Sequence, residues 1–103
     1  MSTADSRLDT DRHGVPQFSG DPEMLEEYMD RAWDLFYGRE GQDVLQVATP
    51  LHLRAQLSGS AYESVRRLGH AELRTKGADG KATEDGMKLL LNTLRVAWLW
   101  RHL

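Results

Sequence analysis

The chain has no cysteine among its 103 residues. This absence excludes disulfide bonds, thiolate chemistry and zinc sites with cysteine ligands, and it fits a reducing compartment. No run of apolar residues approaches the roughly 20 that a membrane-spanning helix needs, and the N-terminus lacks the apolar core of a signal peptide. We therefore expect a cytosolic or nuclear protein, with the cytoplasm as its default location and no membrane partner.

Neither sign of charge dominates the chain, since its net charge is only −3. The charges are nevertheless unevenly placed: residues 1–43 hold 11 acidic and 4 basic residues, whereas residues 44–103 hold 5 acidic and 9 basic ones. Two solvated faces of different sign account for this asymmetry, and opposite patches would also favour head-to-tail encounters between copies. The overall balance is not that of a nucleic-acid-binding domain.

The first part of the chain predicts a tail and then a capped helix. Residues 1–14 are polar and lack a hydrophobic period, so we expect them to be disordered, ahead of a single domain over residues 15–103. Asp21 can cap a helix that starts at Pro22 and ends near Tyr37. The apolar residues of this helix recur at steps of three and four and share one face, onto which Phe18 can fold back: Leu25, Tyr28, Met29, Ala32, Trp33 and Phe36.

Pro50 interrupts the next helical pattern, which runs from Val44 to Leu57. A proline inside a helix costs about 3 kcal/mol, so the pattern favours two pieces. One piece would cover about residues 43–48, and the second would be capped by Thr49. A kinked single helix is the alternative.

The rest of the chain predicts two further helices around a glycine-containing loop. Ser60 and Glu63 stand at the spacing of a capping box, residues 76–81 form a loop, and Thr83 can cap the last helix. That helix has an inward stripe of Met87, Leu90, Leu91, Leu94, Ala97 and Trp98. The sequence thus predicts an all-α fold, a small orthogonal bundle of four to five helices with a short extended N-terminal segment.

No group of residues has the spacing of a catalytic, metal or cofactor site. Ser58 and Ser60 lie between two helices and not at the strand-to-helix turn of a hydrolase. The histidines lie in separate elements without a second ligand at metal-binding spacing: His13, His52, His70 and His102. We expect no enzyme activity, no catalytic residue, no metal, no cofactor and no small-molecule substrate.

Several charged and aromatic side chains are candidates for contact with partners. Trp98 and Trp100 straddle two faces of the last helix, so one of them is a candidate interface anchor. Further candidate interface residues are Glu23, Glu27, Arg66 and Arg67. The basic residues of the middle helices are ordinary solvated bases or, alternatively, weak contacts for RNA phosphates: Arg54, Arg66, Arg67, Arg74, Lys76 and Lys81.

Two short motifs together resemble a known family. The first is Pro-Gln-Phe-Ser-Gly-Asp-Pro at residues 16–22, which leads into a helix containing Trp33. The second is an L-x-G-x-A step at residues 57–61, between two helices. The pair resembles the N-terminal lobe of the capsid domain in Gag proteins of long-terminal-repeat retrotransposons, of Gypsy or copia type. The resemblance covers roughly residues 15–98.

The resemblance implies a helical bundle that associates with its own copies into a shell around the element's RNA. Such Gag proteins often carry a second helical lobe and a Cys–His zinc knuckle, and neither is present here. The chain therefore matches a fragment, a remnant or a domesticated domain, whose alternative role is a module that receives a peptide in a hydrophobic groove. The residues expected to set the fold are Phe18, Leu25, Trp33, Phe36, Leu57, Gly59, Ala61, Leu91 and Leu94.

Overall fold

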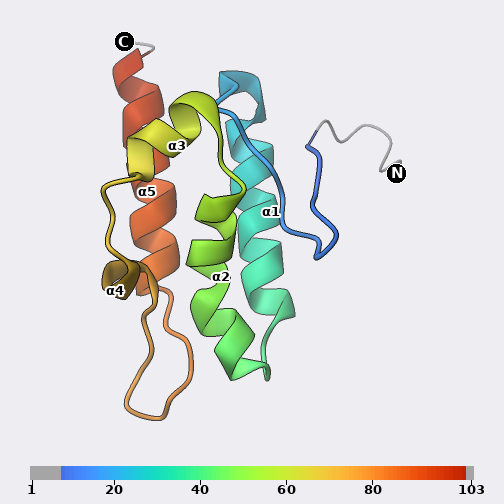
Figure 1. Cartoon of the computed structure of the whole chain (residues 1–103), viewed down its shortest axis with the longest axis vertical. Coiled ribbons are helices and arrows are strands. Elements are labelled where there is room, and N and C mark those ends of the chain that lie inside the picture. The colour runs from blue at the N-terminus through green and yellow to red at the C-terminus, as the bar shows by residue number, and fades with distance from the viewer. Residues whose placement is uncertain (1–7, 102–103) are drawn as a thin grey trace.

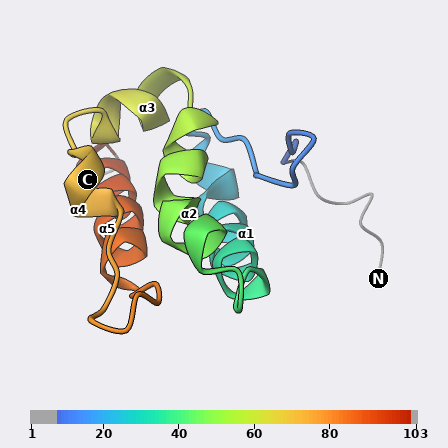
Figure 2. The ribbon, with the colours of Figure 1, turned by 60° about the horizontal axis from the view of Figure 1, so that its bottom comes forward.

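The computed structural model describes residues 8–101, without the side chain of residue 101, and it shows the all-α fold that the sequence predicts (Figure 1). The long helices α1, α2 and α5 lie side by side, α3 crosses one end of the bundle, and α4 packs beside α5 (Figures 1 and 2). A short 3-10 turn precedes α1. The elements are η2 (Pro22–Met24), α1 (Leu25–Gly38), α2 (Asp43–Ala55), α3 (Gly59–Val65), α4 (His70–Leu73) and α5 (Asp85–Arg101).

The start of the first helix follows its local sequence. The Asp21 carboxylate accepts a hydrogen bond from the backbone N–H of Glu23 at 3.0 Å, and Pro22 occupies the first helical turn. This is the cap that the sequence predicts, because a side-chain oxygen there satisfies an N–H that has no partner within the helix. The helix buries the face that carries Leu25, Tyr28, Met29, Ala32 and Phe36.

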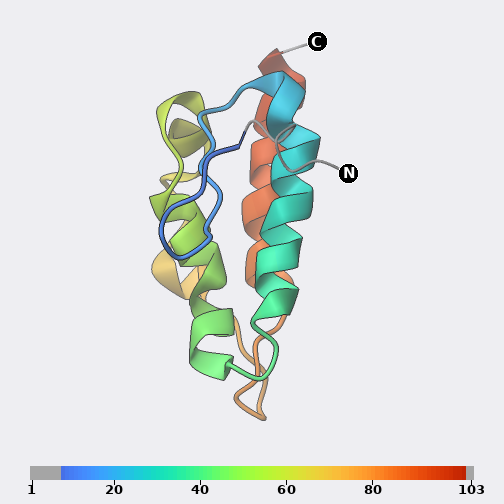
Figure 3. The same ribbon diagram turned by 90° about the vertical axis from the view of Figure 1, so that its right-hand side faces the viewer.

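An extended N-terminal segment, residues 15–19, runs over the α1–α2 pair and reaches the start of α3 (Figure 3). Phe18 forms an isolated parallel bridge with Leu57, and the N–H of Ser58 donates to the Phe18 carbonyl at 3.0 Å. The Phe18 ring stacks on that of Tyr28, with 4.7 Å between ring centroids. Phe18 therefore folds back onto the apolar face of α1, as predicted.

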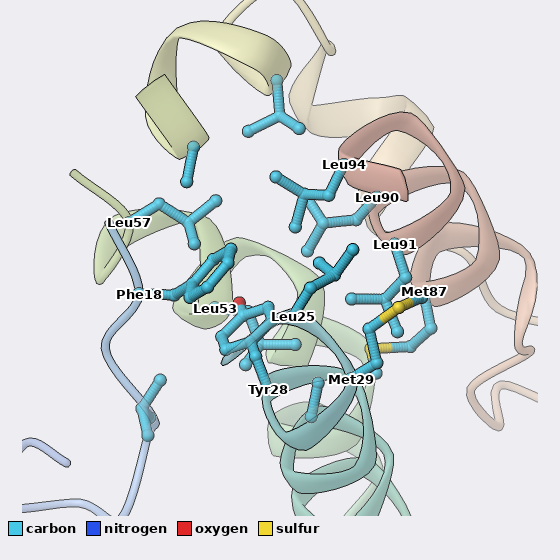
Figure 4. Close-up of a cluster of buried hydrophobic side chains, with 14 of the residues drawn as sticks. Phe18, Leu25, Tyr28, Met29, Leu53, Leu57, Met87, Leu90, Leu91 and Leu94 are labelled. Carbon is cyan, nitrogen blue, oxygen red and sulfur yellow. The ribbon is translucent and has the colours of Figure 1, made fainter. Parts of the chain in front are cut away.

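The hydrophobic core gathers side chains from this segment and from α1, α2 and α5 (Figure 4). Of the residues expected to set the fold, seven are buried: Phe18, Leu25, Phe36, Leu57, Ala61, Leu91 and Leu94. Trp33 is partly buried and packs against the cluster. Gly59 is exposed, but two features favour glycine at this first residue of α3: its φ is +54°, and an added Cβ would lie 3.2 Å from the Ser19 carbonyl oxygen.

The preferred division of the second helix at Pro50 is wrong, because α2 is one helix with the proline inside it. Pro50 has no N–H to donate to the carbonyl of Gln46, four residues earlier. The neighbouring Leu45 carbonyl accepts hydrogen bonds from the Thr49 hydroxyl at 2.9 Å and from Arg39 Nη1 at 3.3 Å. These side-chain donors support the backbone around the proline. Val44, where the predicted helical pattern begins, is 82% exposed, so this pattern does not bury its first apolar residue.

The predicted capping box at Ser60 and Glu63 is also wrong. The α3 helix begins one residue earlier, at Gly59, and Ser60 lies inside it. The Ser60 hydroxyl and the N–H of Ala61 both donate to the Ser19 carbonyl, at 3.3 and 3.4 Å. The Ser19 carbonyl of the extended segment thus accepts the hydrogen bonds at the start of α3, whereas the capping box would have used side chains of the helix itself.

Residues 8–14, the described half of the expected disordered tail, form a hydrogen-bonded turn instead. Asp11 Oδ1 accepts from the N–H groups of His13 and Val15, at 2.8 and 2.9 Å. An isolated antiparallel bridge joins Thr10 to Pro16. These bonds order a segment that has no hydrophobic period of its own. Residues 1–7 lie outside the described part of the chain.

The loop before the last helix is held by backbone bonds as well. An isolated bridge joins Lys76 to Ala82, and the N–H of Gly77 donates to the Lys81 carbonyl at 2.8 Å. Thr83 does not cap α5. Its hydroxyl is buried without a partner among the described residues, while the Thr75 hydroxyl accepts from the N–H of Gly86 at 3.0 Å.

Candidate functional site

The last helix has two apolar faces, and only one of them faces the core. The inward face carries Met87, Leu90, Leu91 and Leu94, all buried as predicted. The second face, here called the α5 outer stripe, consists of Leu89, which is partly buried at the edge of the core, and of Val96, Leu99 and Trp100. Val96, Leu99 and Trp100 are 51%, 44% and 75% exposed. A helix that is apolar on both faces is typical of a helix covered on both sides.

A shallow groove of about 410 Å³ lies along part of this stripe, between α3 and α5. Its lining residues are Ser64, Leu89, Asn92, Thr93, Val96 and Ala97. The two hydroxyls bond within their own helices: Ser64 donates to the Ser60 carbonyl at 2.8 Å, and Thr93 donates to the Leu89 carbonyl at 2.7 Å. They therefore do not require a polar partner from outside, and the groove suits an apolar one.

The two tryptophans near the end of α5 have different surroundings. Trp98 is partly buried and packs against the core, beside Phe18 and Leu25. Trp100 is mostly exposed. Of the two candidate anchors, Trp100 is therefore the one available to a partner, and Trp98 belongs to the packing of the bundle.

The charged candidates for an interface lie on separate helices. Glu27 pairs with Arg31 at 3.6 Å within α1, and Arg66 pairs with Glu63 at 3.2 Å beside α3. Glu23 and Arg67 are exposed. Exposed pairs of this kind contribute about 0–1 kcal/mol, so these side chains do not hold the fold together and can serve as a charged surface.

One ion pair within the molecule joins the acidic first part of the chain to the basic second part. Arg95 of α5 pairs with Glu26 of α1 at 2.9 Å. Arg54, one of the bases considered for RNA contact, donates to the carbonyl of Leu68 and so joins α2 to the turn after α3. The other candidate bases are exposed over α3, α4 and the following loop: Arg66, Arg67, Arg74, Lys76 and Lys81.

The fold brings together two histidines that the sequence leaves apart. His13, from the N-terminal turn, and His52, from α2, line one pocket of about 660 Å³ together with Asp11, Asp34 and Arg39. We call this cavity the Arg39 pocket. His70 begins α4, away from it, and His102 lies outside the described residues. Within residues 8–101 no group of histidine and carboxylate side chains is arranged to hold a metal ion.

Arg39 lies at the end of α1 and is only 9% exposed. Its Nη1 atom contacts three acceptors: the Leu45 carbonyl at 3.3 Å, Thr49 Oγ1 at 3.1 Å and His52 Nδ1 at 2.9 Å. Because a guanidinium only donates, His52 Nδ1 must accept, and the proton of the neutral ring is on Nε2. Burial, and next the nearby Arg39 charge, lower the pKa of His52, which favours this neutral form.

The turn opposite Arg39 presents a stabilised carboxylate. The backbone hydrogen bond from Val15 is the largest influence that lowers the pKa of Asp11, and the charges of His13 and Arg39 act in the same direction. The pocket thus has a cation at one wall and an ionised carboxylate at another. Chemically, this arrangement can bind and orient a polar group, and it contains no nucleophile activated by a base.

The sequence missed this pocket because its residues come from three elements. Arg39 stood only in a helix-breaking Gly-Arg-Glu-Gly stretch, and His52 had no partner at helical spacing. One local signal was available: Asp11 and Gly14 have the spacing typical of the first and last residues of a type I turn. That signal predicts the turn, but not its position against α2.

No family model, curated protein or solved structure matches the chain. No helix within the described residues is both long enough and apolar enough to cross a bilayer. The two candidate sites, the α5 outer stripe and the Arg39 pocket, therefore rest on the side chains themselves.

Proposed function

We propose that this chain is a structural domain that associates with other copies of itself through the α5 outer stripe. In this proposal it is a capsid-like Gag domain, or a remnant of one, from a long-terminal-repeat retrotransposon. The motifs at residues 16–22 and 57–61 support this assignment, because their residues Phe18, Leu57 and Ala61, which the resemblance implies set the fold, are buried. Cytoplasmic location and a shell around RNA belong to the same proposal.

The observation that carries the proposal is the exposed apolar face of α5. Along α5, Val96 follows Leu89 by seven residues and Leu99 follows Val96 by three, with Trp100 next to it. Steps of seven and three are the spacing of a seam between packed helices. Apolar surface of this kind gains free energy when another helix covers it. A tryptophan at the end of such a stripe is a typical anchor of an interface.

A second copy is the partner that the charges favour. Glu23 of η2 and Glu27, Asp30 and Asp34 of α1 are at least partly exposed acids, and Arg66 and Arg67 are exposed in the turn after α3. Opposite patches on one chain attract when two copies approach head to tail. We therefore expect the acidic side chains of one copy to approach the two arginines after α3 on the next.

The test is the mass of the full chain by light scattering over a concentration series, at low and high salt, with RNA removed. We expect the mass to rise with concentration and the rise to shrink at high salt, because salt screens the charged approach. Trp100→Ala should weaken association about tenfold or more, as truncation of an interface anchor typically does.

A matched pair of variants separates the stripe from exposed apolar surface in general. Val96→Glu places a charge on the stripe, whereas Val44→Glu places the same charge on a more exposed valine at the start of α2, which is 82% exposed against 51% for Val96. We expect Val96→Glu to remain monomeric and Val44→Glu to associate like the unchanged chain. Equal association of both variants would rule out the stripe as the interface.

The alternative function is a module that binds a peptide from another protein in the same groove. The groove between α3 and α5 favours this alternative only if the chain does not associate with itself. A strict monomer at all concentrations would therefore overturn self-association and direct the search to amphipathic helical peptides. In that case Val96→Glu should abolish peptide binding while Val44→Glu retains it.

A further inference from the structure

Arg39 is the only charged residue in the described part of the chain that is buried. Burial of an ionised side chain is unfavourable unless the charge is paired or well hydrogen-bonded. Here burial lowers the pKa of Arg39, and the Asp11 carboxylate acts in the opposite direction without forming an ion pair. The Arg39 charge is therefore held by hydrogen bonds to neutral groups and not by an ion pair.

The hydrogen bonds of Arg39 leave one edge of the guanidinium available. All three of its hydrogen bonds use Nη1 and reach neutral acceptors on Leu45, Thr49 and His52. Nε and Nη2 donate to no described residue, and neither is among the polar atoms sealed from solvent without a partner. This edge carries two parallel N–H groups, the arrangement that binds both oxygens of a carboxylate.

The remainder of the Arg39 pocket defines what such a carboxylate would belong to. Its volume of about 660 Å³ lies within the range of ordinary small-molecule sites. Val15, Leu35, Leu45 and Ala55 contribute apolar walls. A ligand that fills the pocket therefore needs an apolar body beside its charged group.

The other charges in the pocket limit the charge of the ligand. Asp11 and Asp34 line the same cavity as Arg39. Two carboxylates repel a multiply charged anion such as phosphate more strongly than they repel a single negative charge. Among anionic groups, a single carboxylate matched to the free guanidinium edge is therefore the one that the site accommodates best.

We infer that the Arg39 pocket binds a small organic monocarboxylate with an apolar body, its carboxylate on Nε and Nη2 of Arg39 and its body against Val15, Leu35 and Leu45. The same chemistry is found at the C-terminus of a peptide that ends in an apolar residue. This binding site is separate from the α5 outer stripe and does not depend on self-association.

The test follows backbone and Arg Nε–H resonances of the full chain by NMR during titration. The probes are phenylacetate, its uncharged analogue phenylacetamide, inorganic phosphate, and a tetrapeptide ending in phenylalanine with a free or an amidated C-terminus. We expect phenylacetate to shift saturably the Arg39 Nε–H and the backbone amide of Gln42, which also lines the pocket. We expect phenylacetamide to bind about tenfold or more weakly, because it forfeits the charge-assisted bonds, and phosphate not to compete.

The peptide distinguishes the two sources of the carboxylate. Tighter binding of the free peptide than of phenylacetate assigns the pocket to a chain terminus, and weaker binding assigns it to a small acid. Both results support carboxylate recognition. Equal binding of the acid and its amide, or no saturable shift by any carboxylate, overturns the inference.

Two variants test the site by different routes. Arg39→Met removes the guanidinium and should lower phenylacetate affinity about tenfold or more, whereas Arg74→Met, at an exposed arginine directly after α4, should leave it unchanged. Because Arg39→Met also removes three hydrogen bonds and can unfold the chain, Ala55→Trp provides a second test. It fills the pocket from an exposed position on α2, and unaltered binding in that variant contradicts the assignment.

Discussion

The apolar core and the corner between α1 and α2 are both buried, but different forces hold them. In the core, Leu53 and Leu90 are fully enclosed by other apolar side chains. In the corner, Gln46 donates to the Phe36 carbonyl at 2.9 Å, and Thr49 receives a hydrogen bond from Arg39. Burial of apolar surface stabilises the core, and directed hydrogen bonds stabilise the corner.

This difference predicts how each region responds to change. Added volume in a close-packed core lowers the stability of the fold, and removal of an unpaired polar atom there raises it. Removal of any donor or acceptor from a polar corner lowers stability, because the remaining partner stays buried without a hydrogen bond. The corner also leaves Nε and Nη2 of Arg39 unused, so one side chain can serve folding through Nη1 and binding through its other edge.

The largest effect is expected where α5 touches α4. A Cβ added at Gly86 would overlap the Leu73 carbonyl oxygen and lie 2.8 Å from the Leu73 carbonyl carbon. Gly86→Ala should therefore push the two helices apart and cost about 1–3 kcal/mol, even though alanine is the better helix former. Urea unfolding with an unchanged m value would measure this loss.

Gly38→Ala is the matched control for this substitution. Gly38 is the last residue of α1, and an added Cβ would meet nothing within 4 Å. We expect this variant to be as stable as the unchanged chain or to gain up to about 1 kcal/mol. If Gly86→Ala behaved in the same way, close contact between α4 and α5 would not be part of the packing.

A smaller effect of opposite sign is expected at Tyr28. Its side chain is fully buried, its hydroxyl has no hydrogen-bond partner within residues 8–101, and burial raises its pKa. Tyr28→Phe removes that oxygen and keeps the ring that stacks on Phe18. We expect a gain of about 1 kcal/mol in the free energy of unfolding, since an unpaired buried hydroxyl costs about 1–3 kcal/mol.

Tyr62→Phe provides the comparison, because Tyr62 is exposed on α3 and its substitution should change stability by less than about 0.5 kcal/mol. A loss of stability in Tyr28→Phe would show that the hydroxyl has a partner, such as a buried water. The core would then contain a satisfied polar group, and its contrast with the corner would be weaker.

The parts of the fold that the sequence predicts are those with local causes. Asp21 caps the helix that follows it, and the inward stripe of α5 has helical spacing. The failures have causes far away in the chain. Pro50 stays inside α2 beside hydrogen bonds from Arg39 and Thr49, and Ser60 bonds to the Ser19 carbonyl, 41 residues earlier.

The candidate sites divide in the same way. The α5 outer stripe could be predicted, because Trp100 and its neighbours fall outside the inward face at helical spacing. The Arg39 pocket could not be predicted, because Asp11, Arg39 and His52 meet only when the N-terminal turn closes over α2. No periodicity or short motif connects residues of three elements.

The smallest expected effect concerns the pH dependence of the corner. Arg39 donates to Nδ1 of His52, and burial together with the Arg39 and His13 charges lowers the pKa of that ring, while Asp11 opposes them. Below the ordinary histidine pKa of about 6.5 the unfolded chain takes up a proton that the folded chain excludes. His52 therefore makes the folded state less stable as the pH falls from 7 through this range.

His52→Asn should flatten this part of the stability profile, because asparagine can offer Arg39 an acceptor oxygen without titrating. Urea unfolding between pH 7.5 and about pH 5.5 measures the slope, with His70→Asn, at the start of α4, as a control that leaves the Arg39 contact in place. A profile for His52→Asn as steep as that of the unchanged chain would show that His52 carries the same protons in the folded and unfolded states. The hydrogen bond from Arg39 would then not fix the neutral ring, and the corner would be less rigidly polar than its geometry indicates.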